Sequence, residues 1–272
     1  MKKNAFIKGA IKKIITSVFL ILAKITKTNL TYAGYAQKSI LNWGNDTKTG
    51  EKFVREIIVK KFISEKPVFF DVGSNVGEYS IALKREYPNA KIYSFEASAN
   101  TYKKILPEAR KENITFLNIG LSSKIGTMTI YDYKMDTWNQ HASLYKDVIK
   151  DIHNSDEYIQ EEVAMDTLDN FCIKNKIETI DFLKIDTEGS ELEVLKGAKD
   201  LIESNKIKII QFEFNEMNVI SRVFLKDYYS SLKNYDIYRM SSGKIIPLPI
   251  YKTENEIFKY QNFLAINKKY NN

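Results

Sequence analysis

The sequence contains a single cysteine, Cys172, among its 272 residues. One cysteine cannot form an intramolecular disulfide, and it also excludes a cysteine-rich zinc site. The composition therefore fits a reducing compartment such as the cytoplasm. Cys172 lies in an apolar periodic stretch with Leu168 and Phe171, where we expect a buried structural thiol and not a nucleophile.

Long apolar runs are also missing. The longest candidate, Ile14 to Ala23, is shorter than the roughly 20 residues that a membrane-spanning helix needs, and no small-residue cleavage site of the signal-peptide type follows it. Apolar residues recur around this run at helical spacing, with lysines between them, which predicts a basic amphipathic helix. Its apolar face consists of Ile7, Ile11, Ile14, Val18, Ile21, Leu22 and Ile25. Such a helix either contacts an anionic membrane through residues 1–28 or packs on its own domain or a dimer partner.

No basic tract long enough to suggest a nucleic-acid-binding region occurs in the sequence. The 41 lysines and arginines occur along the chain among 34 acidic residues, for a formal net charge of +7. Scattered charges of both signs are typical of a solvated surface, so we expect no nucleic-acid partner. With 44% hydrophobic residues the chain can fill a substantial core. We expect a cytoplasmic protein, peripheral at the inner membrane surface if the amphipathic helix binds lipid.

Strand-like and helical segments alternate beyond residue 50. This pattern predicts a helical extension, residues 1–50, and one α/β domain, residues 51–272, with a mostly parallel sheet between helices. The expected strands are Val68–Val72, Lys91–Phe95, Ile114–Ile119, Phe182–Ile185, Lys208–Phe212, Asp236–Met240 and Phe263–Ile266. The expected helices are Val76–Glu86, Asn100–Lys111, Thr167–Asn175 and Glu191–Ser204, with another helical segment after Asn218. Pro107 should kink or shorten the second of these helices. A polar, aromatic stretch at 127–160 interrupts the alternation, and we interpret it as a lid over a substrate.

The strongest motif is FFDVGSNVGEYSIAL at residues 69–83. A buried strand leads into Asp71, a turn contains Gly73 and Gly77, and a helix follows directly. Glycines at such a turn let the backbone approach a ligand at the carboxyl end of the first strand, where open α/β sheets bind cofactors. Asn75 occupies the place of the middle glycine of the dinucleotide fingerprint. By itself, the turn is equally compatible with a structural role.

A carboxylate at the end of the second expected strand indicates which ligand the turn could bind. Glu96 stands 23 residues after Gly73, close to the spacing at which an acidic side chain binds a ribose diol. An ionised carboxylate can accept hydrogen bonds from both hydroxyls, so the two features together predict an adenosine ligand. A dinucleotide requires a third glycine and room for a pyrophosphate, whereas this turn carries Asp71 and the bulkier Asn75. The pattern favours S-adenosylmethionine, whose amino-acid tail has an ammonium group and no phosphate, over NAD.

Acidic residues also gather after the expected strand Phe182–Ile185. Asp186 ends that strand, and Glu188 and Glu191 follow at the start of a helix, where the helix dipole alone can explain Glu191. Asp186 would lie at the carboxyl end of a central strand, where it could contact a methionine moiety, orient an acceptor hydroxyl or hold a metal. Glu213 ends the next strand and is expected to face the same crevice.

Methyl transfer to a hydroxyl is helped by a general base within hydrogen-bond reach of the acceptor. Asp186 is the first candidate, and His141, His153 and Glu213 come after it, since a loop histidine more often has no role. Asp186, Glu188 and Glu213 could also supply oxygen ligands to a divalent cation. No spacing demands such an ion, so a metal is possible and not predicted.

Six sequence blocks follow one another along the chain: FFDVGSNVGEYS, SFEA at 94–97, NIGLSSKIG at 118–126, TLD at 167–169, DFLKIDTEGSELEVLKGA at 181–198 and IIQFEFNE at 209–216. In this order, the blocks resemble the FkbM family of O-methyltransferases. The resemblance covers residues 51–216, and Ala97 and Ser123 replace a proline and an aspartate that are common in the family.

The resemblance implies a Rossmann-like, seven-stranded methyltransferase fold whose last strand runs antiparallel, with S-adenosylmethionine as cofactor. Asp186 and Glu188 would bound the methyl-donor and acceptor side. The residues expected to line the cofactor are Asp71, Gly73, Asn75, Gly77 and Glu96, with Leu121 and Ser122 near the adenine.

The expected activity is O-methylation of a sugar, a glycolipid or polysaccharide precursor, or a secondary metabolite. The expected partner is accordingly a small-molecule or glycan acceptor, and no pattern specifies an oligomeric state. Two alternatives stay open: an NAD-dependent oxidoreductase, and a non-catalytic, membrane-associated binding protein that retains the fold.

Overall fold

The computed structural model describes residues 2–105, 107–133, 142–152 and 155–271. The chain divides into two compact units, Met1–Leu41 and Asn42–Asn272. We expected the α/β domain to begin at residue 51, and the compact unit begins earlier. The reason is that a short helix, α3 (Asp46–Thr49), packs against strand β9 (Tyr235–Ser241) of the sheet.

The first unit consists of two helices, α1 (Lys2–Thr26) and α2 (Leu30–Gln37). Asn29 separates them, and its side-chain oxygen accepts a hydrogen bond of 3.1 Å from the backbone N–H of Tyr32, which caps α2. Among the described residues, no single helix is long and apolar enough to cross a membrane. The segments Ile11–Thr26 and Leu30–Gln37 meet that requirement only as a pair, with a bend of 116° between them.

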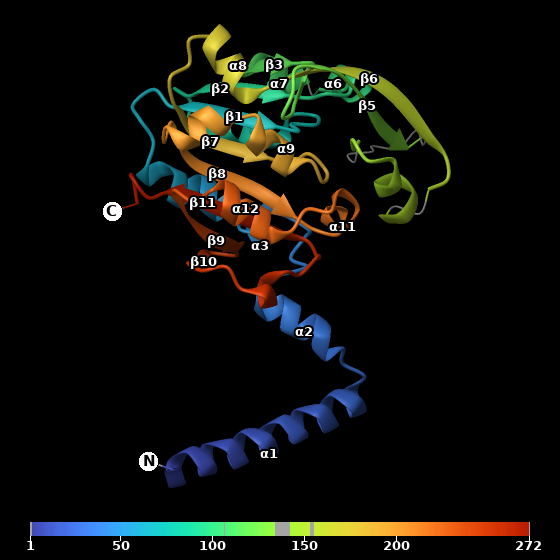
Figure 1. Cartoon of the computed structure of the whole chain (residues 1–272), viewed down its shortest axis with the longest axis vertical. Coiled ribbons are helices and arrows are strands. Elements are labelled where there is room, and N and C mark those ends of the chain that lie inside the picture. The colour runs from blue at the N-terminus through green and yellow to red at the C-terminus, as the bar shows by residue number, and fades with distance from the viewer. Residues whose placement is uncertain (1, 106, 134–141, 153–154, 272) are drawn as a thin grey trace. The chain divides into compact units, whose positions relative to one another are not determined.

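The second unit is built on an eight-stranded sheet with the order β10–β9–β11–β8–β7–β1–β2–β3 (Figure 1). Its parallel strands are β1 (Val68–Val72), β2 (Lys91–Phe95), β3 (Thr115–Leu117), β7 (Ile180–Ile185) and β8 (Ile207–Phe214). The last strand, β11 (Gln261–Asn267), runs antiparallel to its neighbours β8 and β9. The mostly parallel α/β sheet agrees with our prediction, but the strand number does not, because β10 (Lys244–Pro247) folds back on β9 and adds an eighth strand at the edge.

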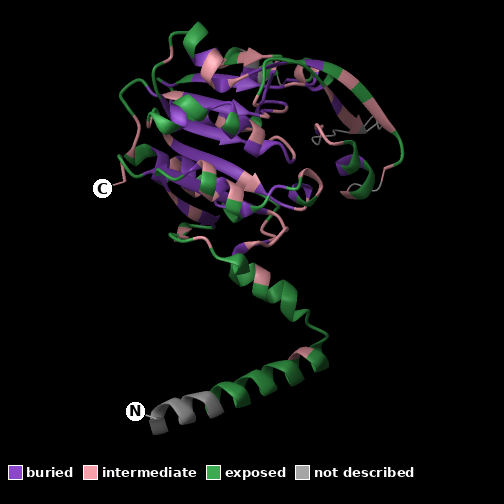
Figure 2. Cartoon of the chain, viewed as in Figure 1, coloured by how far each residue is buried: buried purple, intermediate pink, exposed green. Residues whose placement is uncertain are grey.

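Helices cover both faces of this sheet because successive residues of the central strands are apolar and point to opposite sides. On β1, Phe70 packs into one core and Phe69 into the other. The strands are accordingly buried almost throughout (Figure 2). One core includes residues of α8 (Leu168–Lys174), α9 (Glu191–Lys196), α10 (Lys199–Glu203) and α12 (Leu225–Ser231). The other includes residues of η1 (Val54–Ile58), η2 (Val59–Lys61) and α5 (Glu78–Glu86).

The stretch at 127–160, which we expected to be irregular, begins and ends in strands. A second sheet has the order β4–β6–β5 and joins β4 (Gly120–Leu121), β6 (Tyr158–Asp166) and β5 (Gly126–Tyr133). Strands β5 and β6 pair antiparallel over their whole lengths, so backbone pairing outweighs the polar composition that suggested a loop. A one-turn helix, η3 (Val148–Ile152), lies between them in sequence. Trp138, His141 and His153 lie outside the described residues.

Two of the expected helices are interrupted. The segment 100–111 forms α6 (Ala99–Lys103) and α7 (Pro107–Lys111), and Pro107 starts the second helix, where its missing N–H costs nothing. The segment 191–204 breaks between α9 and α10, where a Cβ on Gly197 would lie 2.0 Å from the carbonyl oxygen of Ser122. The remaining short elements are α4 (Glu51–Phe53), α11 (Met217–Ser221) and η4 (Thr253–Asn255).

Candidate active site

The candidate site lies where the strand order reverses. Strand β1 pairs with β2 on one side and with β7 on the other, so the loops after β1 and β7 leave the sheet beside each other. The backbone N–H of Asp186 donates to the carbonyl oxygen of Val72 at 2.9 Å, and the N–H of Gly73 donates to that of Phe95 at 3.0 Å. These bonds hold the ends of three strands together at a position where open α/β sheets bind ligands.

The turn after β1 requires its glycines. Gly73, Asn75 and Gly77 have φ angles of +77°, +51° and +91°, a region that glycine adopts without strain and asparagine tolerates. A Cβ on Gly73 would lie only 1.7 Å from the carbonyl oxygen of Asp186. One on Gly77 would lie 3.0 Å from the ring of Phe116. Gly73 thus permits close approach of the two loops, and Gly77 permits the turn into α5.

Glu96 follows β2 and is bound by the same turn. Its two carboxylate oxygens accept hydrogen bonds from the backbone N–H groups of Asn75, at 3.0 Å, and Ser98, at 2.9 Å. Burial raises the pKa of Glu96 to about 7, although these two hydrogen bonds act in the opposite direction. Each oxygen keeps a lone pair that could accept from a ligand hydroxyl.

A small, mainly apolar cavity opens beside Glu96. Apolar side chains from both sheets surround the buried carboxylate of Glu96, which suits a flat ring system attached to a polyhydroxyl group. The lining residues include Val72, Phe95, Ala97, Leu121, Ile130, Leu144 and Met165 together with Gly73, Glu96, Asp186 and Glu188. Gly120 also lines it, and a Cβ there would lie 2.4 Å from the sulfur of Met165, so a larger residue would fill the space.

A larger cavity, of about 750 Å³, lies on the other side of the loop after β1. Its charged lining residues are mostly acidic, and part of its wall comes from segments far away in sequence. The acidic lining residues are Asp46, Glu51, Glu78, Asp186, Glu188, Glu213 and Glu216, the basic ones Arg55 and Lys184, and the aromatic ones Trp43, Tyr79 and Tyr260.

Three residues line both cavities: Gly73, Asp186 and Glu188. The cavities therefore adjoin at the loops that follow β1 and β7. A ligand in the smaller cavity and another in the larger one would approach each other beside Asp186, whose side chain is 36% exposed.

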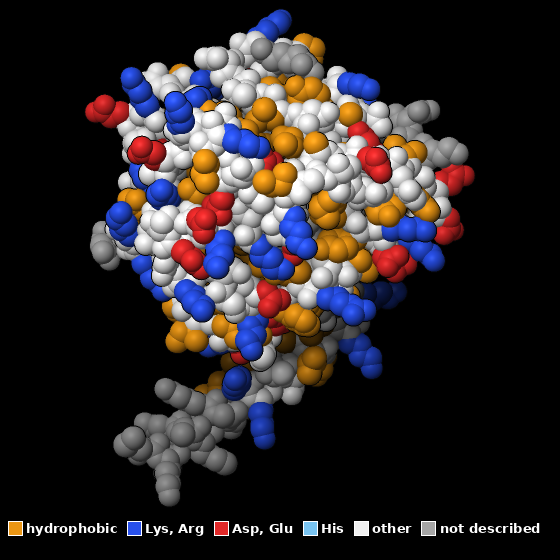
Figure 3. Space-filling view, turned by 45° about the horizontal axis from the view of Figure 1, so that its top comes forward, with side chains coloured by type: hydrophobic (Ala, Val, Ile, Leu, Met, Phe, Trp, Pro, Cys, Tyr) orange, Lys and Arg blue, Asp and Glu red, His pale blue; other side chains and the backbone are white. Residues whose placement is uncertain are grey.

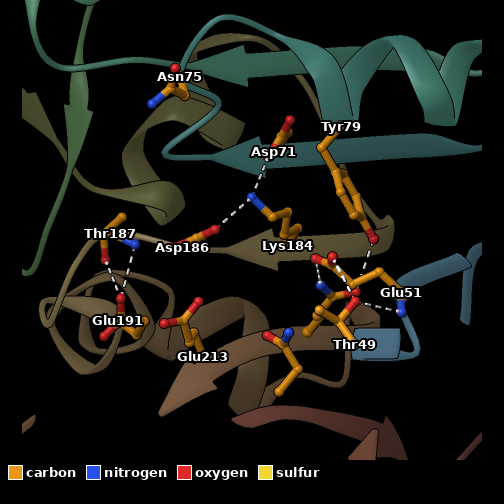
Figure 4. A network of polar contacts seen from close by, with 12 residues as sticks. Thr49, Glu51, Asp71, Asn75, Tyr79, Lys184, Asp186, Thr187, Glu191 and Glu213 are labelled. Carbon is orange, nitrogen blue, oxygen red and sulfur yellow. Dashed lines mark hydrogen bonds and ion pairs between the residues drawn. The ribbon is translucent and has the colours of Figure 1, made fainter. Parts of the chain in front are cut away.

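A row of buried polar side chains crosses the sheet behind the larger cavity. Ser94, Asp71, Lys184 and Gln211 occupy paired positions on β2, β1, β7 and β8. In this row the ammonium nitrogen of Lys184 lies 3.5 Å from a carboxylate oxygen of Asp71 and 3.2 Å from one of Asp186 (Figure 4). The second oxygen of Asp71 accepts a 2.6 Å hydrogen bond from the hydroxyl of Ser80.

The surroundings of Lys184 keep it charged. Burial by itself would lower the pKa of Lys184, but the carboxylates of Asp186, Asp71 and Glu51 outweigh burial and raise this pKa well above its usual value. The ammonium also lies 5.0 Å from the centre of the Tyr79 ring. Lys184 thus connects a fully buried carboxylate, Asp71, to a partly exposed one, Asp186.

Glu51 lies at the end of the row that is formed by Gln211. It accepts hydrogen bonds of 3.0 Å from the hydroxyl of Thr49 and from the side-chain amide of Gln211, whose oxygen accepts one of 2.9 Å from the hydroxyl of Tyr79. Burial raises the pKa of Glu51, while Lys184 lowers it. This carboxylate is therefore tied to the sheet although it belongs to α4, which precedes the first strand.

Glu191 organises the loop after β7. One of its carboxylate oxygens accepts hydrogen bonds from the backbone N–H groups of Thr187, at 2.9 Å, and Gly189, at 3.1 Å. These bonds stabilise the turn in which Glu188 has a φ angle of +53°. Because Glu191 is bound within the loop, a structural role accounts for it.

Glu213 completes the acidic group around Asp186. Burial raises its pKa well above the usual value, and the neighbouring carboxylates of Asp186, Glu188 and Glu191 raise it further. Its side chain also accepts a hydrogen bond from the amide of Asn215. Among the described residues, no group of three or more His, Cys, Asp or Glu side chains is arranged to hold a metal ion.

The structure gathers most of the residues that the sequence analysis selected, but not all. Gly73, Asn75, Glu96, Leu121, Asp186 and Glu188 line one or both cavities, and His141 lies outside the described residues. Asp71, Gly77 and Ser122 are not among the described residues that line either cavity. Asp71 points into the polar row, Gly77 packs on Phe116, and the N–H of Ser122 donates to the carbonyl oxygen of Asp166 at 3.0 Å.

The sequence analysis missed several residues of the larger cavity. Lys184 had a detectable signal, because a lysine inside the apolar segment DFLKI must be buried with a partner if that segment is a central strand. Trp43, Glu51, Arg55 and Tyr260 had none, since no periodicity relates them to the carboxyl ends of β7 and β8.

Several known proteins that resemble this chain, and the family whose model matches it, are methyltransferases. The model of the methyltransferase FkbM domain matches residues 71–235. The methyltransferase sdnD of Sordaria araneosa is 29% identical over 162 residues, which cover 51% of this chain and 62% of that protein.

Two further relatives have more specific names. The hexuronic acid methyltransferase AglP of Haloferax volcanii is 24% identical over 66% of this chain and 71% of its own length. The 31-O-demethyl-FK506 methyltransferase FkbM of Streptomyces tacrolimicus is 26% identical over 49% of this chain and 60% of its own length. The chain thus spans about three fifths to seven tenths of these relatives. Because the matched domain includes the glycine turn, Glu96 and the acidic group after β7, the chain belongs to the FkbM family of methyltransferases.

Proposed function

We propose that this protein is an S-adenosylmethionine-dependent O-methyltransferase that acts on a hydroxyl of a sugar, a glycolipid or polysaccharide precursor, or a secondary metabolite. The observation that carries the proposal is the pair of chemically different cavities that share Gly73, Asp186 and Glu188. A group-transfer enzyme needs two binding sites that meet where the group is exchanged, and alignment of the two reactants supplies much of the rate.

The residues of the smaller cavity fit S-adenosylmethionine. Its apolar walls, including Leu121 and Met165, suit an adenine ring, and the buried carboxylate of Glu96 can accept from two ribose hydroxyls. Gly73 would let the cofactor approach the backbone, and the nearby Asp186 and Glu188 would favour its positive charge. When bound, the cofactor supplies a methyl group on a sulfonium centre.

Asp186 is the proposed general base. It lies at the junction of the cavities, and its ion pair with Lys184 holds its carboxylate in one orientation. Glu213 faces the same cavity, but its strongly raised pKa favours the protonated form, which can donate a hydrogen bond to an acceptor and cannot take a proton from it. The proton of the acceptor hydroxyl would therefore pass to Asp186.

The walls of the larger cavity support an acceptor rich in hydroxyl groups. The carboxylate of Glu188 can accept from hydroxyls and protonated Glu213 can donate to them, and the rings of Trp43 and Tyr260, 6.5 Å apart at 84°, can pack against a sugar ring. The names of two relatives point the same way, one to hexuronic acid and the other to an oxygen atom of FK506. We propose no metal and no nucleic-acid partner. We also propose a cytoplasmic location, in keeping with a single cysteine.

Calorimetry with the purified protein tests this proposal. S-adenosylmethionine and S-adenosylhomocysteine should bind with micromolar dissociation constants, and NAD should not bind. Binding of NAD alone would favour an oxidoreductase. Failure of all three ligands to bind a folded sample would overturn the enzymatic assignment and leave a binding protein that retains the fold.

A further inference from the structure

Helix α1 carries a continuous apolar face that its own unit leaves exposed. Seven apolar side chains of this face are between 49% and 72% exposed to solvent, and α2 contains no buried residue (Figure 2). These side chains are Ile11, Ile14, Ile15, Val18, Ile21, Leu22 and Ile25. An exposed apolar surface of this length on one element marks an interaction site.

Three lysines of α1 and one in the turn that follows it lie opposite this apolar face. At about 100° per residue the seven apolar residues fall within one sector of about 120°, and Lys12, Lys13, Lys24 and Lys27 fall within a sector of similar width on the other side. All four lysines are exposed. Of the apolar residues at positions 11–26, Leu20 and Ala23 fall on the basic side, and Phe19 falls between the two sectors. A helix divided in this way lies in the plane of a membrane surface, with its apolar face in the lipid and its lysines among the headgroups.

The charge of this segment is exceptional within the chain. Residues 1–45 contain eight lysines and no acidic residue, whereas the rest of the chain has 33 lysines and arginines against 34 acidic residues. The formal charge of +7 therefore comes entirely from this segment. On the face of the second unit shown in Figure 3, basic and acidic side chains are interspersed.

We propose that α1 binds the surface of a membrane that contains anionic lipids. The ten-residue run Ile14–Ala23 rises about 15 Å, half of a hydrocarbon core of about 30 Å, so it can enter one leaflet without crossing the bilayer. The basic side then attracts anionic headgroups, and each lysine near the surface strengthens binding. A second copy of α1 would also cover the apolar face, but it would leave the four lysines on the opposite side without anionic partners, which a surface of anionic headgroups supplies.

Vesicle co-sedimentation of the full chain tests this proposal. We expect binding to vesicles of phosphatidylglycerol and phosphatidylcholine, at least about tenfold weaker binding to pure phosphatidylcholine, and loss of affinity as salt is raised. The triple variant Ile14→Glu, Val18→Glu, Ile21→Glu should abolish binding. Replacing the four lysines of the basic side (Lys12, Lys13, Lys24 and Lys27) by glutamine should weaken binding by about tenfold or more.

Matched controls separate this surface from general effects on the protein. Ile173, on α8, is 75% exposed, so Ile173→Glu should leave vesicle binding unchanged. Lys60, Lys61, Lys66 and Lys233 are exposed lysines of the second unit, and their replacement by glutamine should also have no effect. S-adenosylmethionine affinity and the thermal midpoint should stay unchanged in all of these variants, which shows that the catalytic unit is intact.

If something other than a membrane covers the apolar face of α1, these experiments give different results. If α1 pairs with a second copy, light scattering will show a dimer that the triple glutamate variant dissociates, without vesicle binding. If α1 packs on its own domain, the chain will be monomeric, will not bind vesicles, and will lose thermal stability in the triple variant. Either result, or equal binding to neutral and anionic vesicles, overturns the proposal.

Discussion

The two cavities that meet at Asp186 are built from different parts of the chain. All lining residues of the smaller one lie between Val72 and Ser190, inside the segment that matches the FkbM domain. The larger one adds Trp43, Glu51 and Tyr260, which lie outside that segment. The proposed cofactor side therefore belongs to the shared domain, whereas part of the proposed acceptor side is contributed by flanking segments.

The cavities also differ in how they use charge. The smaller one has apolar walls and the buried carboxylate of Glu96, bound by backbone N–H groups. The larger one depends on a buried network in which Lys184 balances several carboxylates. Changes in the network should therefore affect folding most, and changes at Glu96 should affect ligand affinity most.

The largest effect is expected from Lys184→Met, which removes the cation between Asp71 and Asp186. Asp71 would be left fully buried without its ion-pair partner, so we expect the free energy of unfolding to fall by about 3–5 kcal/mol in urea denaturation. Lys199→Met is a matched control, because Lys199 is 68% exposed and pairs only with an exposed glutamate. The double variant Lys184→Met, Asp71→Asn should recover part of the loss, and no recovery would mean that unpaired charge is not the cause.

Gly73→Ala should damage both cavities at once. Its Cβ would lie 1.7 Å from the carbonyl oxygen of Asp186, and the φ angle of +77° is strained for alanine. We expect a loss of about 3 kcal/mol of stability and no measurable S-adenosylmethionine binding in calorimetry. Gly34→Ala is the control, since a Cβ at that position would meet no atom within 4 Å other than its chain neighbours and the backbone of its own helix. A Gly73→Ala variant with normal affinity would contradict the role given to this close approach.

Glu96→Ala distinguishes the cavities, because the side chain of Glu96 lines only the smaller one among the described residues. Loss of charge-assisted hydrogen bonds to the ribose should weaken S-adenosylmethionine binding by about ten- to hundredfold in calorimetry, with little effect on the thermal midpoint. Glu78, an exposed carboxylate that lines the larger cavity, provides the comparison. Equal effects of Glu96→Ala and Glu78→Ala would mean that the cofactor has been assigned to the wrong cavity.

The pH dependence of cofactor binding gives the smallest effect. Because the pKa of Glu96 is raised to about 7 in the free protein, and the charged form is needed to accept from the ribose, affinity should rise by about tenfold between pH 6 and pH 8. In the variant Glu96→Gln this rise should disappear. A dissociation constant that is flat over this range in the unaltered protein would refute the assignment.

The same raised pKa has the opposite consequence for stability. The folded state holds the Glu96 proton more tightly than the unfolded chain, whose glutamate has a pKa of about 4.5. The contribution of Glu96 to the free energy of unfolding is therefore greatest below pH 4.5 and is lost as the pH rises towards 7. The free energy of unfolding of Glu96→Gln and of the unaltered protein, compared between pH 4.5 and pH 7, isolates the contribution of Glu96.

Much of the site could be predicted because its signals are local. Apolar segments that alternate with helical ones identified the strands. The positive φ angles of Gly73 and Gly77 are the physical reason why the turn after the first strand contains glycines. Glu96 could be placed because the residue that follows a parallel strand lies at the same edge of the sheet as the turn after the neighbouring strand. Pro107 divided a predicted helix for an equally local reason.

Tertiary structure alone decided which way the acidic residues point and what surrounds them. Asp71 lies one residue before the end of the strand that leads into the glycine turn, yet its side chain pairs with Lys184 on a neighbouring strand and lines neither cavity. Glu51 and Tyr260 are separated by most of the chain and line one cavity. Sequence periodicity reports which face of an element is buried, whereas contacts between distant segments depend on packing that no short pattern records.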